Sequence, residues 1–217
     1  MTFDFERFWE TLIYRSPPHA WQHLQLVLIP LAVAFLVAFP VAILLTRPRF
    51  SRYADRVMAV FSSGQTIPPL AVIAIFFPFL GLGRRPALFA LTIYALLPIA
   101  RNTLAAIKGI SPEVKEAARG MGMSPWQVLT RVEIPLSVPV VMAGIKVSAV
   151  LISGTAALGA LIGGGGMGAV LFAGINFFRV ELILAGTLVI AGIAIAFDRM
   201  LSLLDYLLSP ANLRIRS

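Results

Sequence analysis

Long apolar runs separate the charges along this chain. Three runs carry no charged residue: Leu24–Thr46 with 23 residues, Val57–Gly83 with 27 and Val147–Phe178 with 32. Two shorter runs, Pro86–Ala100 and Leu182–Phe197, reach a similar length when extended past a flanking charge. A membrane-spanning helix needs roughly 20 predominantly apolar residues, because lipid offers the backbone no hydrogen-bond partner. The pattern therefore predicts an all-α integral membrane protein with five transmembrane helices, at about residues 24–46, 62–81, 86–104, 141–163 and 182–203.

Residues 1–19 have a different character. They contain acidic side chains rather than a basic n-region, so we do not expect a cleaved signal peptide. Apolar side chains fall at helical spacing on one side of this segment: Phe3, Phe5, Phe8, Trp9, Leu12 and Ile13. The spacing predicts an amphipathic helix in the membrane interface, with a disordered tail as the alternative. His19 and His23 follow, and we expect them at the interface; a metal-binding pair is the alternative.

Composition and charge narrow the function. Apolar residues make up 59% of the chain and charged residues 13%, with a mean hydropathy of +0.88. In average soluble domains the apolar fraction is about 45–50% and the charged fraction about 25%. Cysteine is absent, which excludes disulfides and thiolate metal sites. The sequence shows no catalytic set, no Walker A motif and no cofactor or metal signature, so we expect no enzyme activity in this chain.

The net charge of +8 is explained by membrane topology rather than by nucleic acid. If the N-terminus lies outside, thirteen of the eighteen basic residues lie on the inner side, as the positive-inside rule requires. The inner set is Arg47, Arg49, Arg52, Arg56, Arg101, Lys108, Lys115, Arg119, Arg131, Lys146, Arg199, Arg214 and Arg216, and the outer set is Arg7, Arg15, Arg84, Arg85 and Arg179. This predicts an inner-membrane protein with a cytoplasmic tail at residues 204–217 and no nucleic-acid partner.

The connection between the third and fourth spans carries most of the readable chemistry. Ser111–Glu113 has the features of a helix start: a hydroxyl, a proline and an acid in the first turn. Gly120 and Gly122 interrupt that helix, and Ser124–Gln127 restarts it with capping-box spacing. Pro135 ends the second helix. We therefore predict two short helices exposed to the cytoplasm.

The stretch from Glu116 to Pro135 reads EAARGMGMSPWQVLTRVEIP. Its Glu-Ala-Ala, the glycine that follows and the Ile-Pro pair resemble the EAA loop of permeases of binding-protein-dependent ABC importers. The resemblance implies that residues 105–136, called the coupling loop below, carry the helix that docks on an ATPase subunit. The residues that it assigns to ATPase coupling are Glu116, Ala117, Ala118, Gly120, Met121, Ser124, Ile134 and Pro135.

Residues 20–203 as a whole are similar to the permeases of osmoprotectant importers, which carry glycine betaine, carnitine or choline. The similarity rests on Gln65–Pro69 within the second span, Pro98–Thr103 at the end of the third, and Gly154–Ala156 and Gly159–Gly168 after the fourth. It implies a type I ABC importer permease fold and alternating access. It also implies a second permease subunit, two ATPase subunits and an extracytoplasmic binding protein. The glycine run is expected to form an outer turn; an extra glycine departs from the usual motif and leaves the osmolyte open.

Neutral polar residues mark the expected substrate pathway: Gln65, Thr66, Ser153 and Thr155. A quaternary ammonium solute needs modest polar groups rather than deep anionic wells, since transport requires release. The alternative is that these side chains only bond backbone carbonyls freed near the prolines.

Other readings of the sequence remain open. Asp198 is expected to pair with Arg199 or Lys146, with a proton relay as the alternative. A secondary transporter or channel without ATPases is the alternative function, although neither an internal repeat nor a row of buried charges is evident. A membrane scaffold is a third.

Overall fold

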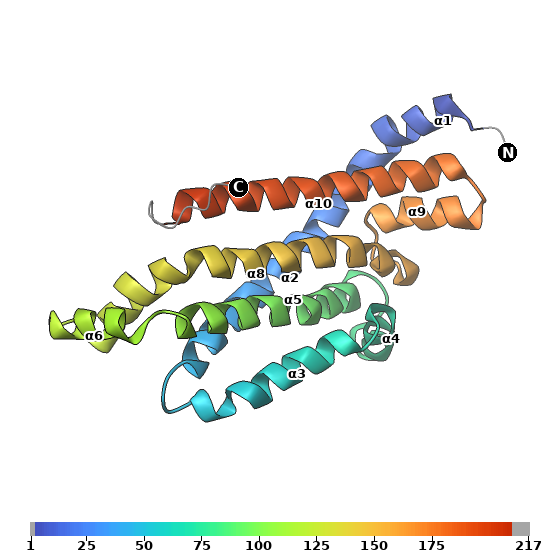
Figure 1. The fold of residues 1–217 in the computed structure, drawn as a ribbon. Helices are drawn as coiled ribbons and strands as arrows, with labels where there is room; N and C mark the ends of the chain where they lie inside the picture. The colour runs from blue at the N-terminus through green and yellow to red at the C-terminus, as the bar shows by residue number, and fades with distance from the viewer. Residues whose placement is uncertain (1–2, 210–217) are drawn as a thin grey trace.

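The computed structural model describes residues 3–209, and every regular element in that range is helical. In chain order the elements are α1 (Phe5–Glu10), the π-helical turn η1 (Thr11–Arg15), α2 (Ser16–Leu45), the 3₁₀ turn η2 (Ser51–Tyr53), α3 (Ala54–Thr66), α4 (Pro69–Leu80), α5 (Arg84–Lys108), α6 (Pro112–Gly120), α7 (Pro125–Val128), the π-helical turn η3 (Leu129–Glu133), α8 (Ile134–Thr155), the 3₁₀ helix η4 (Ala156–Ile162), α9 (Met167–Asn176) and α10 (Val180–Leu208). Figure 1 shows them as an elongated bundle.

The all-α membrane architecture is confirmed. Within residues 3–209, four helical stretches are long and apolar enough to cross a membrane: Phe5–Leu45, Arg84–Lys108, Pro125–Ile162 and Val180–Leu208. A fifth crossing is present if α3, extended back to Ser51, and α4 are counted as one span; this pair is bent by 95°. The bend lies at Ile67 and Pro68, which are both extended, because a residue before proline is disfavoured in the helical region.

The helices differ from the predicted ranges in several places. The segment expected to end at residue 19 is not separate, since α1 and η1 lead directly into α2. The range 62–81 is divided by the bend between α3 and α4. The fourth long helix begins within the range assigned to the coupling loop, and α10 extends into the expected tail. The rest of that tail, with Arg214 and Arg216, lies outside the described residues.

Helix α9 was not predicted. The glycine run at 163–168 was expected to form one outer turn, but only the glycines up to Gly166 lie in the turn, and Met167 begins α9. Both belong to the 32-residue uncharged run, so hydropathy could not separate a span, a turn and a short returning helix. Helix α9 packs on α10 and η4 at one end of the bundle (Figure 1).

Helix α5 is the centre of the bundle, packed between α2 and α8 and covered further by α3 and α4. Its contact surfaces are built from small side chains, which let membrane helices approach closely. Gly144 marks the tightest point: a Cβ there would lie 2.7 Å from the carbonyl oxygen of Pro98 on α5. The fully buried alanines of this core are Ala34, Ala38, Ala42, Ala87, Ala95, Ala100, Ala149 and Ala156.

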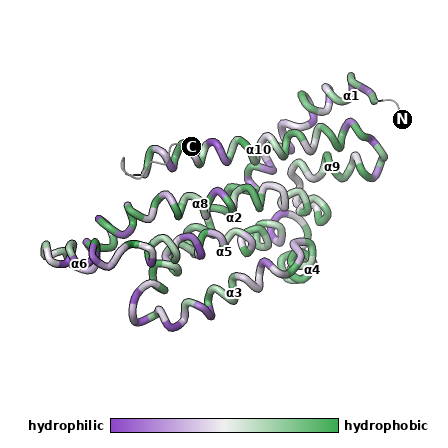
Figure 2. The backbone as a smooth tube through the Cα atoms, viewed as in Figure 1, coloured by the Kyte–Doolittle hydropathy of each residue, from purple (hydrophilic) through white to green (hydrophobic). Residues whose placement is uncertain are grey.

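The two ends of the bundle carry different elements. Helix α6 projects at one end, whereas α4 and the turn before α9 lie at the other (Figure 1). Figure 2 shows hydrophilic residues around α6 and in the loop that precedes α3, at the same end. The structure therefore places the coupling loop beyond the ends of the long helices.

Candidate functional site: the coupling loop

Helix α6 begins where the sequence predicted, at Pro112. Ser111 occupies the N-cap position with extended backbone, but its hydroxyl makes no capping bond to the backbone. Glu113 is bonded instead: its own backbone N–H and the Ser111 hydroxyl lower the pKa of the carboxyl. A carboxylate in the first turn also interacts favourably with the helix dipole.

The end of α6 is a Schellman motif, and this corrects the expectation that both Gly120 and Gly122 interrupt the helix. The Gly122 N–H donates to the Arg119 carbonyl at 2.9 Å, and the Met123 N–H donates to the Ala118 carbonyl at 3.2 Å. Gly122 has a φ of +81°, the left-handed conformation that this motif requires. Gly120 is still helical, and a Cβ added there would meet nothing within 4 Å. Gly122 therefore makes the turn, and Gly120 leaves an open surface.

The predicted capping box at the start of α7 is confirmed. The Ser124 hydroxyl accepts from the Gln127 N–H at 3.3 Å, and the Gln127 side chain accepts from the Ser124 N–H at 2.8 Å. The π-helical turn η3 then carries the chain into α8. Ile134 and Pro135 form the first, half-buried turn of α8. The expectation that Pro135 ends the second helix is therefore wrong, because the chain stays helical from Pro125 to Ile162.

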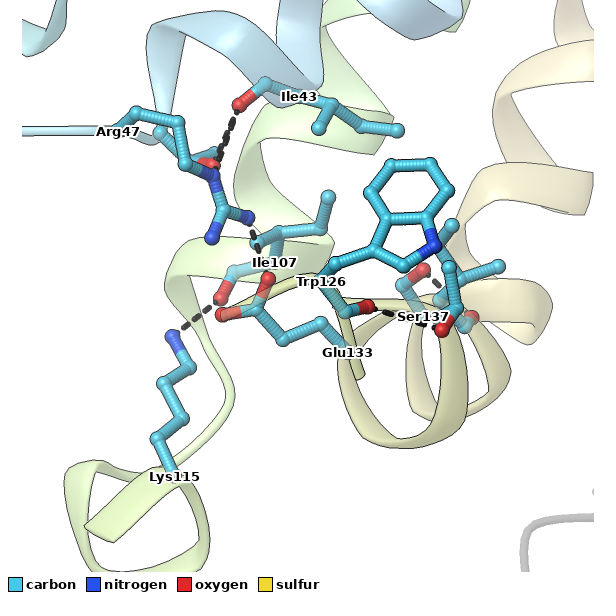
Figure 3. Close-up of polar contacts among 10 residues, drawn as sticks. Ile43, Arg47, Ile107, Lys115, Trp126, Glu133 and Ser137 are labelled. Carbon is cyan, nitrogen blue, oxygen red and sulfur yellow. Dashed lines mark hydrogen bonds and ion pairs between the residues drawn. The ribbon is translucent and has the colours of Figure 1, made fainter. Parts of the chain in front are cut away.

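Two contacts hold the coupling loop against the bundle (Figure 3). The Arg47 guanidinium, just past the end of α2, forms an ion pair with the buried carboxylate of Glu133 in η3. The Lys115 ammonium donates to the carbonyl oxygen of Ile107 at the end of α5, at 2.9 Å. Arg47 also donates to the carbonyl of Ile43. The loop is thus tied to both α2 and α5.

The outer surface of the loop is formed by most of the predicted coupling residues. Glu116, Ala117, Gly120, Met121 and Ser124 are exposed, and the Met121 side chain is 72% exposed. Ala118, which was also assigned to coupling, is instead buried, since α6 packs on α7 and η3. Sequence reasoning did not select Trp126, although its side chain is 70% exposed. Large exposed apolar side chains on a polar loop are typical of a protein interface.

The four pathway candidates do not lie on one surface. The hydroxyl of Ser153 is buried and donates to the Ala149 carbonyl at 2.7 Å, and the amide of Gln65 donates to the Tyr94 carbonyl at 2.7 Å. Thr66, at the end of α3, and Thr155, at the end of α8, are more exposed.

The hydroxyls of these two threonines also bond to backbone carbonyls, those of Ser63 and Leu151, both at 2.8 Å. All four side chains therefore bond backbone carbonyls, but Ser153 and Thr155 bond carbonyls four residues earlier in their own helix, which no proline frees.

Two expectations about ionisable residues are wrong. His23 does not lie at an interface: it is fully buried, and its Nε2 lies 2.9 Å from the carbonyl oxygen of Ser153. Asp198 forms an ion pair with neither Arg199 nor Lys146 within residues 3–209, and Lys146 pairs with Asp205 at 3.0 Å instead. Within residues 3–209, His, Asp and Glu side chains do not gather in threes to form a metal site.

Comparison with known proteins decides the family. The model of the family described as "Binding-protein-dependent transport system inner membrane component" matches residues 21–211. The chain belongs to that family. This inner membrane component is 44% identical to the carnitine transport permease protein OpuCB of Listeria monocytogenes, across 89% of this chain and 88% of that protein. It is 37% identical to the choline transport system permease protein OpuBB of Bacillus subtilis, across 94% and 91%.

Solved structures agree on the fold of this inner membrane component. An inward-facing conformation of the MetNI methionine ABC transporter matches with a TM-score of 0.72 and 23% identity, covering 92% of this chain and 98% of that one. At that identity the likeness shows the fold alone.

Sequence reasoning found the surface of the coupling loop but not its supports. Arg47 and Glu133 are 86 residues apart, and no local sequence feature of either residue predicts that the two form a pair. Trp126 had a local signal, because a large apolar side chain in the first turn of a polar, exposed helix has nothing local to pack against.

Proposed function

We propose that this chain imports a small osmoprotectant of the quaternary ammonium class, such as glycine betaine, choline or carnitine, by ATP-driven alternating access. The names of relatives at 37–44% identity, which transport carnitine or choline, support the substrate class. The single observation that carries the ATP-driven mechanism is the coupling loop, with its exposed Glu116, Ala117, Gly120 and Met121 beyond the end of the bundle. ATP hydrolysis then belongs to separate ATPase subunits.

In this proposal the loop receives the motion of an ATPase and passes it to the helices. The ion pair between Arg47 and Glu133 and the bond from Lys115 to Ile107 transmit force into α2 and α5. We place this end in the cytoplasm and the N-terminus and the glycine turn outside. The concentration of basic residues near the coupling end supports that orientation.

A second permease subunit packs on the outward face of α8 in this proposal. Four exposed residues line that face at helical spacing: the small Ala143 and Gly154, with Val147 and Val150 between them. A Cβ on Gly154 would meet nothing within 4 Å, so the missing side chain relieves no contact within this chain. Close approach of another helix is the usual use of such a residue in a membrane. Thr155 and Thr66 are then the pathway candidates best placed to face the partner, and an extracytoplasmic binding protein delivers the substrate.

Uptake of radiolabelled choline, glycine betaine and carnitine by cells expressing the complete transporter tests the proposal. Glu116→Lys and Gly120→Val are expected to abolish ATP-driven uptake and ATPase co-purification while the chain still inserts. Gly120→Val changes only the surface, because the added side chain meets open space. Arg131→Gln, an exposed change elsewhere in the loop, is the matched control and should retain uptake.

Full ATP-driven uptake by Gly120→Val would remove α6 from coupling. Uptake that persists without any ATPase and follows an ion gradient would instead favour a secondary transporter.

A further inference from the structure

The connection between α8 and α9, residues 156–166, is built mainly of small residues, with Leu158 and Ile162 packed against the core, and is called the hinge segment below. It consists of the seven-residue 3₁₀ helix η4 and a turn of four glycines, Gly163–Gly166. Runs of 3₁₀ helix longer than three or four residues are uncommon, and such a stretch within a helix often marks a functional hinge. Alanine and glycine dominate the segment, so its position depends on contacts from elsewhere.

Helix α2 supplies two of those contacts. His23 is fully buried, and its Nε2 lies 2.9 Å from the carbonyl oxygen of Ser153, just before the hinge segment. A carbonyl only accepts, so Nε2 carries the hydrogen. Nδ1 is buried and has no hydrogen-bond partner among residues 3–209, so the neutral ring with its hydrogen on Nε2 satisfies the one bond that is present. The neighbouring Gln22 accepts from the Gly166 N–H at 3.0 Å, at the far end of the segment.

The glycine turn fits closely on this part of α2. A Cβ on Gly165 would lie 2.5 Å from the Gln22 side-chain oxygen. A Cβ on Gly166 would lie 3.0 Å from Leu26 and 3.3 Å from the His23 ring. Both glycines have φ near +78°, which other residues rarely adopt. The turn therefore fits Gln22 and His23 by shape, and Gln22 also accepts a hydrogen bond from it.

We propose that Gln22 and His23 form a clamp that holds the hinge segment closed, and that the clamp must release for the pathway to open at the end opposite the coupling loop. The inference rests on the alternating access proposed above. The clamp joins α2 to backbone groups 130 and 144 residues away, so it reports the relative position of α2 and the α8–α9 connection. Both bonds are neutral, and the loss of one shifts a closed–open equilibrium by only about 2- to 13-fold.

A cysteine reporter tests the clamp, because the chain has no cysteine of its own. Thr155→Cys, at the end of α8, is labelled in membranes with an impermeant maleimide applied from the side of the glycine turn. Gln22→Ala and His23→Ala are each expected to raise the labelling rate about 2- to 13-fold. His23→Gln should stay near the unmodified rate, since its amide nitrogen can replace Nε2 as donor.

Gln25→Ala is the matched control, because Gln25 lies one turn further along α2 and contacts Arg84 rather than the hinge segment. A second reporter, Val140→Cys near the coupling end of the same α8 face, is labelled with the same maleimide applied from the side of the coupling loop, and it should label at an unchanged rate in every variant. A general loosening of the bundle would raise both reporters.

Equal labelling in Gln22→Ala and Gln25→Ala, or a parallel rise at both reporters, overturns the clamp. If His23→Ala does not reach the membrane, Gln22→Ala decides, since Gln22 is only partly buried. The labelling requires neither ATPase nor substrate. A failure of ATP-driven uptake, which would count against the importer, is therefore seen separately from a failure of the clamp.

Discussion

The ion pair between Arg47 and Glu133 should control how firmly the coupling loop is held. The Glu133 side chain is 4% exposed and that of Arg47 is 30% exposed, so Arg47→Ala leaves a carboxylate in a site that is largely closed to water. Removing one partner of a fully buried pair costs about 3–5 kcal/mol. Because Arg47 is partly solvated, we expect about 2–3 kcal/mol, which is about a 30- to 150-fold change in a local opening equilibrium.

Hydrogen exchange of the backbone amides in η3 and the first turn of α8 measures that equilibrium directly, since exchange there requires local opening. Arg47→Ala should accelerate exchange by the factor given above, while amides in the middle of α5 keep their rates. Arg49→Ala is the matched control: it removes the same charge two residues away, where the guanidinium lies over the Phe50 ring and forms no ion pair within residues 3–209.

A double-mutant cycle completes the test. Glu133→Gln removes the charge that needs a partner, so the double variant Arg47→Ala/Glu133→Gln should exchange more slowly than Arg47→Ala alone. Additive effects of the two changes, or an acceleration below about twofold in Arg47→Ala, would refute the view that this pair holds the loop.

Three further predictions concern the glycines and the start of α6. Gly122→Val should lower stability by about 1–2 kcal/mol, because φ is +81° there, whereas Gly120→Ala should leave the thermal unfolding temperature nearly unchanged. Gly144→Ala should destabilise the purified protein by about 1–3 kcal/mol, because the added Cβ would collide with the α5 backbone, whereas Gly154→Ala should fold normally. A melting curve in detergent that gives Gly154→Ala the lower melting temperature would contradict the close packing of α8 on α5 at Gly144. The pKa of Glu113 is lowered in the folded chain, so the ionised carboxylate stabilises α6 at pH values above the unfolded pKa of about 4.5. This stabilisation is lost as pH falls through the lower folded pKa. Hydrogen exchange of the α6 amides should therefore accelerate below that range in the native chain but not in Glu113→Gln.

Local chemistry made part of the coupling loop predictable. A capping box, a proline at a helix start and a glycine at a helix end act over three or four residues, so Ser124–Gln127 and Pro112 could be read directly. The role of the two glycines could not, because both fit the end of a helix. The hydrogen bonds of the Schellman motif decide in favour of Gly122.

Tertiary burial was less predictable. His23 precedes an apolar run and has the sequence context of an interfacial residue, yet it is buried because the α8–α9 connection folds back over α2. Helix α9 was hidden for a related reason, since residues 147–178 carry no charge that would mark the end of a span. Five spans could be predicted from run length, and Pro68 and Pro69 give a local reason for a break in the second. The angle of 95° at that break could not be predicted, because it also depends on how α4 packs against α5.

The unbroken length of α8 has a mechanical consequence. Its 22 residues span about 33 Å at a rise of about 1.5 Å each, from the ion-paired turn η3 to the start of η4. Since Gly144 is locked against α5 near the middle, the helix can act as a lever with a central fulcrum. Each degree of rotation about that point moves either end by about 0.3 Å in opposite directions. Displacements of one or two ångströms at the ends then require only a few degrees of tilt, which a stretch of alanine and glycine can absorb without unfolding.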